Sequence, residues 1–195
     1  AFLANPGLAL NAATRAMLTL ADKVELMLRE TILTFDDRDG TRVRSLVALE
    51  EEVDRDQEQI KLYLARLMQR DLTAAEGERV LEAVTFTTNL EHIGDIIDKG
   101  LVRLAIKKQK HGLSFSEEGW VEIRQFHALI AEQMRRAVAV FVSRDVGMAR
   151  DLVARKDRLR QEEQVATQRH FARLRDGLAE TIETSALHLD VLRDL

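Results

Sequence analysis

The chain has 195 residues, which is long enough to bury a substantial core, and 46% of them are hydrophobic but only 5% aromatic, so the predicted core is aliphatic. The formal net charge of −4 and the lack of aromatics among the basic residues argue against nucleic-acid binding. The chain has no cysteine, which excludes disulfides and thiolate chemistry, and its longest apolar run, residues 137–142, is too short to insert into a bilayer.

Apolar residues recur at spacings of three and four along the chain, which predicts helices that each bury one face. The first helix is expected over residues 17–35 and the second over residues 46–67. Thr73 followed by Glu76 forms a capping-box sequence that opens a third helix. That helix is expected to stop before Gly112.

Ser116 is the predicted cap of a fourth helix, which continues to Phe141. A break at residues 143–146 separates it from a fifth helix, whose last apolar position is Leu174. Gly177 then separates a short sixth helix. Because no segment alternates polar and apolar residues with period two, the predicted fold class is all-α.

The order of helices suggests one three-helix unit that is used twice. Residues 89–96 (NLEHIGDI) align with residues 188–195 (HLDVLRDL), since both contain leucine, an acid, and an aspartate four positions after that acid. The prediction is two repeated antiparallel three-helix bundles. A linker and the two bundles are expected at residues 1–10, 11–113 and 114–195. The sequence stops one residue after Asp194, so the last helix is expected to be truncated.

Pairs of acidic residues four positions apart lie on one helix face, with Cβ atoms about 6 Å apart. Two pairs occupy matching positions of the repeats and a third lies on the second helix: Glu91 with Asp95, Asp190 with Asp194, and Glu50 with Asp54. Like charges this close repel unless a cation, an arginine or a proton intervenes. Oxygen-only ligands favour a divalent or iron-type metal ion, so these six residues are the candidate metal ligands.

Solvated salt bridges are the alternative explanation, because acid pairs at this spacing are common on exposed helices. The apolar residues around Glu91 and the repetition of the pair in both halves favour a bound cation. In the second half, Lys156 and Arg160 stand where Glu50 and Asp54 stand in the first. Any second-half site is therefore expected to be weaker, or to be replaced by internal ion pairs.

Catalytic signatures are missing from the sequence. A carboxylate di-iron enzyme needs Glu-x-x-His, and none of the five histidines has an acid three positions before it. No serine lies in a nucleophile elbow, and no glycine-rich loop could hold a phosphate. The sequence therefore predicts a non-catalytic protein that works by binding partners.

Residues 89–98 (NLEHIGDIID) resemble the Glu-x-x-x-Asp signature of the PhoU family of phosphate-uptake regulators. The specific part of the resemblance is Glu91, Gly94 and Asp95, while the rest, residues 11–195, agrees in helix order. It implies a pair of three-helix bundles that can hold metal clusters on these motifs. Gly94 suits such a site, because a missing side chain permits close helix approach.

The second repeat carries Arg193 where free-standing PhoU proteins usually have glycine, and this form is more similar to the cytoplasmic C-terminal domain of bacterial sodium/phosphate cotransporters. Residues 5–10 also resemble the linker that leaves the membrane domain of that family. Lys99 stands where free-standing members often have asparagine. The resemblance implies a non-catalytic regulatory domain of a sodium-dependent phosphate importer, on the cytoplasmic side of the bacterial inner membrane.

The implied partners are a transmembrane phosphate-transport domain of the same polypeptide and a second copy of the chain in a homodimer. The alternative function is a free-standing PhoU-type adaptor that connects a sensor kinase to a phosphate transporter. Membrane-spanning stretches before Ala1 would favour the first function, and an immediate methionine the second. A third alternative is a helical spacer without a ligand, in which replacing Glu91 and Asp95 by amides leaves transport unchanged.

Overall fold

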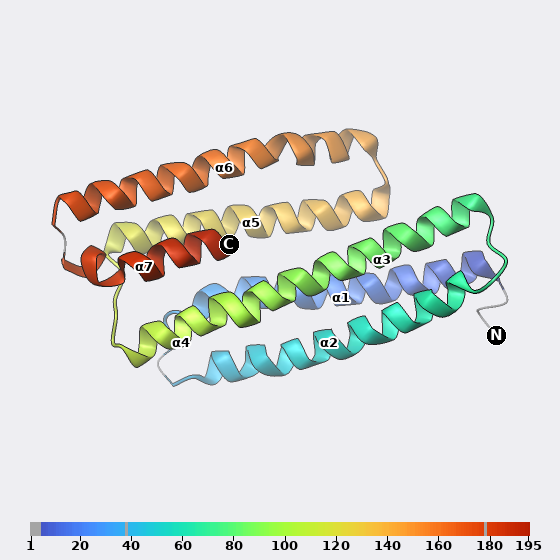
Figure 1. Cartoon of the computed structure of the whole chain (residues 1–195), viewed down its shortest axis with the longest axis horizontal. Helices are drawn as coiled ribbons and strands as arrows, with labels where there is room; N and C mark the ends of the chain where they lie inside the picture. Colours follow the sequence, from blue (N-terminus) through green and yellow to red (C-terminus); the bar gives the residue numbers. More distant parts are fainter. Residues whose placement is uncertain (1–4, 38, 178) are drawn as a thin grey trace.

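The computed structural model describes residues 5–37, 39–177 and 179–195, and within these ranges the regular secondary structure is helical throughout. Figure 1 shows two groups of long helices side by side, one from the N-terminal part of the chain and one from the C-terminal part. The predicted all-α class with two three-helix bundles is confirmed. None of the described helices combines the length and the apolar character needed to cross a membrane.

The first bundle consists of three rods. They are α1 (Pro6–Thr34), α2 (Thr41–Met68), and a rod made of α3 (Ala74–Asp95), the π-helical segment η2 (Ile96–Val102) and α4 (Arg103–Lys110). The third rod begins with the predicted capping box. The Thr73 hydroxyl accepts a hydrogen bond from the Glu76 N–H at 3.3 Å, and the Glu76 carboxylate accepts one from the Thr73 N–H at 2.9 Å.

Helix α1 begins earlier than the sequence predicted. The Asn5 side chain caps it by accepting the Leu8 N–H at 3.2 Å, and Pro6 occupies the first turn, where its missing N–H leaves no bond unmade. Residues 6–10, which we expected in a linker, are therefore helical, and Leu10 is buried in the core. The expected start of the first bundle at residue 11 is corrected to Pro6.

The π-helical segment η2 was not predicted. It follows Asp95 directly and contains Asp98 and Lys99. A π-turn holds an extra residue, so it rotates the side chains that follow, and such segments often occur at functional sites. Its buried residues are Ile97, Leu101 and Val102, and the spacing of four between the first two is also that of an ordinary α-helix, so the apolar spacing did not single out this segment.

The second bundle consists of α5 (Glu117–Ser143), α6 (Val146–Arg175) and α7 (Ala179–Asp194). Ser116 caps α5 as predicted, since its hydroxyl accepts a backbone N–H of the first turn at 3.2 Å. The predicted break between the fourth and fifth helices is a tight turn in which Arg144 adopts a left-handed conformation, with φ of 56°. Asp145 then caps α6.

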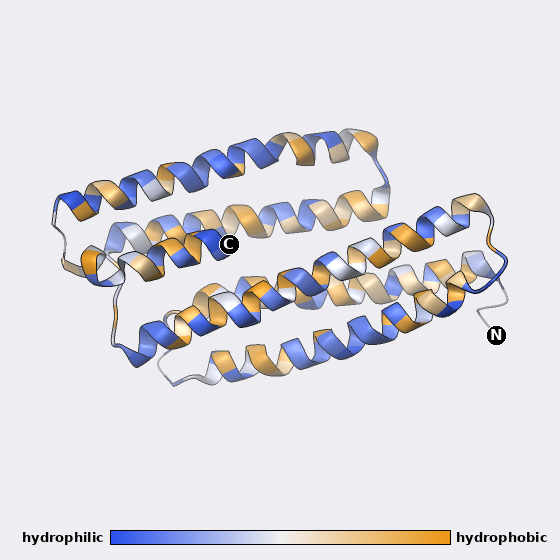
Figure 2. Cartoon of the chain, in the orientation of Figure 1, coloured by the Kyte–Doolittle hydropathy of each residue, from blue (hydrophilic) through white to orange (hydrophobic). Residues whose placement is uncertain are grey.

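The two bundles bury their helices to different extents. Helix α1 buries an aliphatic stripe that extends from Leu10 to Leu28, so it forms the centre of the core. Helix α6 buries only Ala166 and His170 among its described residues. Figure 2 agrees with this difference, because hydrophilic residues cover much of α6. The first bundle therefore has the more extensive apolar core.

The bundles meet where α1 packs against α5, and where η2 and α4 pack against α7. In the first contact, His127 Nε2 on α5 donates a hydrogen bond to the Leu28 carbonyl oxygen on α1 at 2.7 Å. In the second contact, a Cβ added to Gly100 would lie 2.9 Å from Asp194 Oδ2. Gly100 therefore permits the Asp194 carboxylate to approach the backbone of η2 closely.

Candidate functional site

The two carboxylates of the first predicted acid pair each contact a different lysine. Glu91 accepts a hydrogen bond from Lys61 Nζ of α2 at 2.7 Å, and Asp95 accepts one from Lys99 Nζ of η2 at 2.6 Å. Lys61 holds the pKa of Glu91 below its usual value, because the ammonium stabilises the ionised carboxylate. All four side chains are partly exposed to solvent.

Lys99 lies among carboxylates from two helices. Its pKa is raised first by the hydrogen bond to Asp95 and further by the charges of Asp54 and Glu50 on α2. Burial raises the pKa of Glu50, and the nearby Asp54 and Asp98 raise it further. The structure therefore brings Asp95 to the second-helix pair, and it adds Asp98 and Lys99 to this cluster.

The second acid pair is held by an arginine of its own helix. Arg193 Nη1 donates to Asp190 Oδ1 at 2.9 Å, and Arg193 Nε donates to Asp194 Oδ1 at 3.0 Å. Because Asp194 also lies against Gly100, this pair is close to the contact between the bundles. Arg193, which departs from the glycine of the resembled motif, supplies the positive charge that two neighbouring carboxylates require.

These contacts determine how well the carboxylates suit a metal ion. A hard cation needs several oxygen ligands directed at one point. Within residues 5–37, 39–177 and 179–195, no group of three or more acidic or histidine side chains is placed to hold a metal. The Glu91–Asp95 and Asp190–Asp194 pairs instead have lysines or an arginine bound to their carboxylates. The arrangement does not fit a metal ion, and metal binding by the six residues stays a prediction.

A buried polar cluster in the second bundle was not predicted. Glu122 of α5 and Arg173 of α6 form a two-pronged salt bridge with N–O distances of 3.0 and 2.7 Å. Beside it, the rings of His170 and His188 stack with centroids 4.4 Å apart. His170 Nε2 lies 2.9 Å from the hydroxyl of Ser185. The cluster joins α5, α6 and α7, so we assign it a structural role.

Burial favours the neutral form of both histidines. It lowers the pKa of His188 to about 3, and the adjacent His170 and Arg173 add to this effect. Burial also lowers the pKa of His170. No sequence pattern indicates this pair, because the two residues lie on different helices and outside any motif. They are packed core residues, in line with the interpretation of lone histidines as surface or packed residues.

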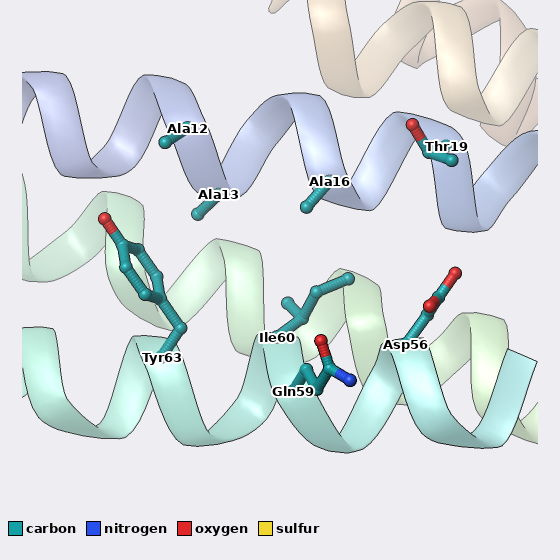
Figure 3. A pocket seen from close by; sticks show the side chains of 8 residues that line it. All are labelled: Ala12, Ala13, Ala16, Thr19, Asp56, Gln59, Ile60 and Tyr63. Atoms are coloured by element: carbon teal, nitrogen blue, oxygen red, sulfur yellow. The ribbon is translucent and has the colours of Figure 1, made fainter.

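A groove of about 440 Å³ lies between α1 and α2 (Figure 3). The residues that line it are Ala12, Ala13, Ala16, Thr19, Asp56, Gln59, Ile60 and Tyr63. Its one acid, Asp56, is paired with Lys23 at 2.9 Å. The lining has no histidine, serine or cysteine, so it offers no nucleophile and base for catalysis.

Replacing His127 by alanine is expected to lower the free energy of unfolding by about 1–3 kcal/mol, because it removes the hydrogen bond between the bundles and leaves a cavity. Urea denaturation followed by circular dichroism measures this loss. His92→Ala, at an exposed position of α3, is the matched control. Equal losses in the two variants would show that the His127 contact contributes nothing.

The fold and one family define the class of this protein. The PhoU domain family matches residues 17–100, which include the Glu91–Asp95 pair. PhoU from Pseudomonas aeruginosa superimposes with a TM-score of 0.85 at 18% identity, over 96% of this chain and 88% of that one. The phosphate transport system regulatory protein PhoU from Streptococcus pneumoniae gives 0.81 at 16% identity, over 97% and 89%. Residues 17–100 match the PhoU domain family and the chain has a PhoU-like fold, so the resemblance is confirmed. PhoU domains are non-catalytic, as the sequence predicted.

Longer proteins are similar over nearly the whole chain. The putative inorganic phosphate export protein YjbB of Salmonella typhimurium is 33% identical, and that of Escherichia coli K12 is 31% identical, over 195 residues. Each alignment covers 99% of this chain and 35% of the relative. The chain therefore spans about a third of the length of these curated relatives.

Proposed function

We propose that this chain is a non-catalytic regulatory domain of a longer membrane protein that transports inorganic phosphate. The observation that carries the proposal is the similarity to the putative phosphate export proteins, which spans 99% of this chain but only 35% of those proteins. The remaining length of such a protein would supply the transmembrane partner. The free-standing adaptor has less support, because the solved PhoU structures are similar in fold alone, at 16–18% identity.

The name of the relatives bears on the direction of transport. The resemblance to sodium/phosphate cotransporters implies uptake, whereas the relatives are named for export. We therefore favour export of inorganic phosphate as the activity that this domain regulates. In this proposal the domain lies on the cytoplasmic side of the membrane, where it would contact the membrane part of the same polypeptide.

Regulation in this proposal operates through the packing of the two bundles. The bundles are joined by limited contacts, α1 on α5 and η2 with α4 on α7, so a small change there can alter their relative orientation. A membrane domain attached to the chain would respond to that orientation. The contacts of His127 with Leu28 and of Asp194 with Gly100 support this step, because each joins the bundles directly.

Phosphate flux tests the proposal. The natural polypeptide would be reconstituted in proteoliposomes beside a version that lacks the residues of this chain, and release of radioactive phosphate would be followed. We expect flux to change several-fold on removal, with equal amounts of protein in the membrane. A version with an unrelated helical domain of similar size controls for mass. Equal flux in all three proteins would contradict a regulatory role.

A further inference from the structure

The acidic motifs of this protein are accompanied by positive charges of the chain itself. Lys99 is four residues after Asp95 and bonds to it at 2.6 Å, and Arg193 bonds to both Asp190 and Asp194 at 2.9 and 3.0 Å. In both cases the cation is on the same rod as the aspartate that it contacts. Helix geometry therefore holds each positive charge next to its carboxylates.

Further carboxylates lie on the helix that packs against this rod. Helix α2, which carries Glu50 and Asp54, packs against α3 and η2, and η2 itself contains Asp98 beside Lys99. One ammonium thus lies where acids from two helices would otherwise repel each other. A divalent ion at this place would have to displace Lys99 and overcome its repulsion.

Two further lysines of the first bundle contact its acidic residues, here from a neighbouring helix. Lys61 bonds to Glu91 at 2.7 Å, and Lys23 contacts both Glu52 and Asp56, another pair four residues apart, at 2.9 Å. Each of these bonds crosses between helices, Lys61 from α2 to α3 and Lys23 from α1 to α2. Lysines of the chain therefore neutralise these acidic residues of the first bundle.

The second motif connects this charge pattern to the contact between the bundles. Asp194 lies against Gly100, the residue directly after Lys99, while Arg193 holds the other side of its carboxyl group. The two motifs therefore meet at one place, where η2 of the first bundle contacts α7 of the second.

We propose that Lys99 and Arg193 take the place of a metal ion at the two acidic motifs, so that the domain folds and joins its bundles without bound metal. The signal that the domain senses is then not the occupancy of a metal site at these residues. A second consequence is that removing the tethered charge should create a cation requirement that the natural chain lacks.

Metal content and melting temperature test the natural chain. Protein purified without chelator is expected to contain far less than one equivalent of any transition metal by mass spectrometry. Its melting temperature is expected to be the same with EDTA, with MnCl₂ and with MgCl₂. A stoichiometric metal whose removal by EDTA lowers the melting temperature would overturn the proposal.

The variant Lys99→Asn tests whether the Lys99 ammonium replaces a divalent metal ion at the first acidic motif. Without divalent ions, its melting temperature is expected to fall by a few degrees, because the carboxylates of α2 and η2 now repel. MnCl₂ or MgCl₂ is expected to restore it. Lys156→Asn, which makes the same charge change at an exposed position of α6, is the control and should not respond to either salt.

A double variant extends the test to the second motif. Lys99→Asn with Arg193→Gln leaves both acidic motifs without their tethered charges, and its response to MnCl₂ should exceed that of Lys99→Asn alone. Titration of manganese, followed by calorimetry, measures this binding directly. If neither variant gains sensitivity to divalent ions over the natural chain and the Lys156→Asn control, the proposal is wrong.

Discussion

Replacing Arg173 by alanine is expected to lower the free energy of unfolding by about 3–5 kcal/mol, because it leaves the Glu122 carboxylate as an uncompensated buried charge. The two side chains are only 12% and 9% exposed, so solvent screens the pair little. The bridge also joins α5 to α6, a helix that contributes few other buried residues. Urea denaturation followed by circular dichroism measures the loss.

An exposed ion pair of the same bundle provides the control. Arg136 contacts Glu132 on the surface of α5, where the side chains are 42% and 40% exposed, so Arg136→Ala should change stability far less than Arg173→Ala. Replacing both buried partners by apolar residues, Glu122→Leu with Arg173→Met, should recover much of the loss. Equal effects of Arg173→Ala and Arg136→Ala would show that burial of the bridge has no energetic consequence.

The free energy of unfolding is expected to fall as the pH drops below about 6.5, the ordinary pKa of histidine in an unfolded chain. In the folded chain the pKa of His188 is lowered to about 3, so the unfolded state takes up its proton first. The stabilisation is complete above pH 6.5 and is lost as the pH falls toward the folded pKa. For one histidine this loss amounts to about 1.6 kcal/mol between pH 6.5 and pH 5.

His188→Leu tests this assignment, because leucine fills the site without a titrating group. The ring of His188 faces His170, and Arg173 and Glu122 are the charged groups nearby. His170 and His127 also have lowered pKa values and still titrate in the variant, so its pH dependence should become shallower but not flat. His111→Gln, at an exposed turn, should leave the slope unchanged. Identical slopes for the natural chain and His188→Leu would exclude His188 as the cause.

The helices and their ends could be predicted from sequence because their determinants are local. The Thr73–Glu76 capping box and the Ser116 cap occur where the sequence placed them. The α1 start was missed, because the apolar spacing was counted from Met17 and the cap formed by Asn5 with Pro6 was interpreted as a linker. The π-helical segment was not predicted, because the spacing of four between Ile97 and Leu101 is also that of an α-helix.

The candidate site was predictable only in part. The sequence identified Asp95, Glu50 and Asp54 as candidates, but a Cβ added to Gly94 would lie 3.7 Å from Val53 Cγ1, an ordinary contact, so the approach of α2 does not depend on this glycine. The sequence did not show that Lys99 and Arg193 would bind the acids, because spacing alone does not distinguish a metal ligand from one half of an ion pair. The contacts of Arg193 with Asp190 and Asp194 are internal ion pairs, which were the alternative expected for the second half.

The buried cluster of the second bundle could not be predicted at all. Glu122, Arg173, His170 and His188 come from three helices, and their contact depends on how α5, α6 and α7 pack. In the sequence, each of these four residues is an ordinary polar residue of an amphipathic helix. Long-range packing of this kind, rather than any local pattern, makes them a unit.

Phosphate flux through the natural polypeptide carrying His127→Ala tests most directly whether the packing of the two bundles governs transport. Val80→Ala, which shortens a fully buried core residue within the first bundle, controls for general loss of stability. We predict that His127→Ala changes the rate of phosphate release several-fold while Val80→Ala does not. Unchanged flux in His127→Ala, with the hydrogen bond to Leu28 lost, would contradict the proposed coupling.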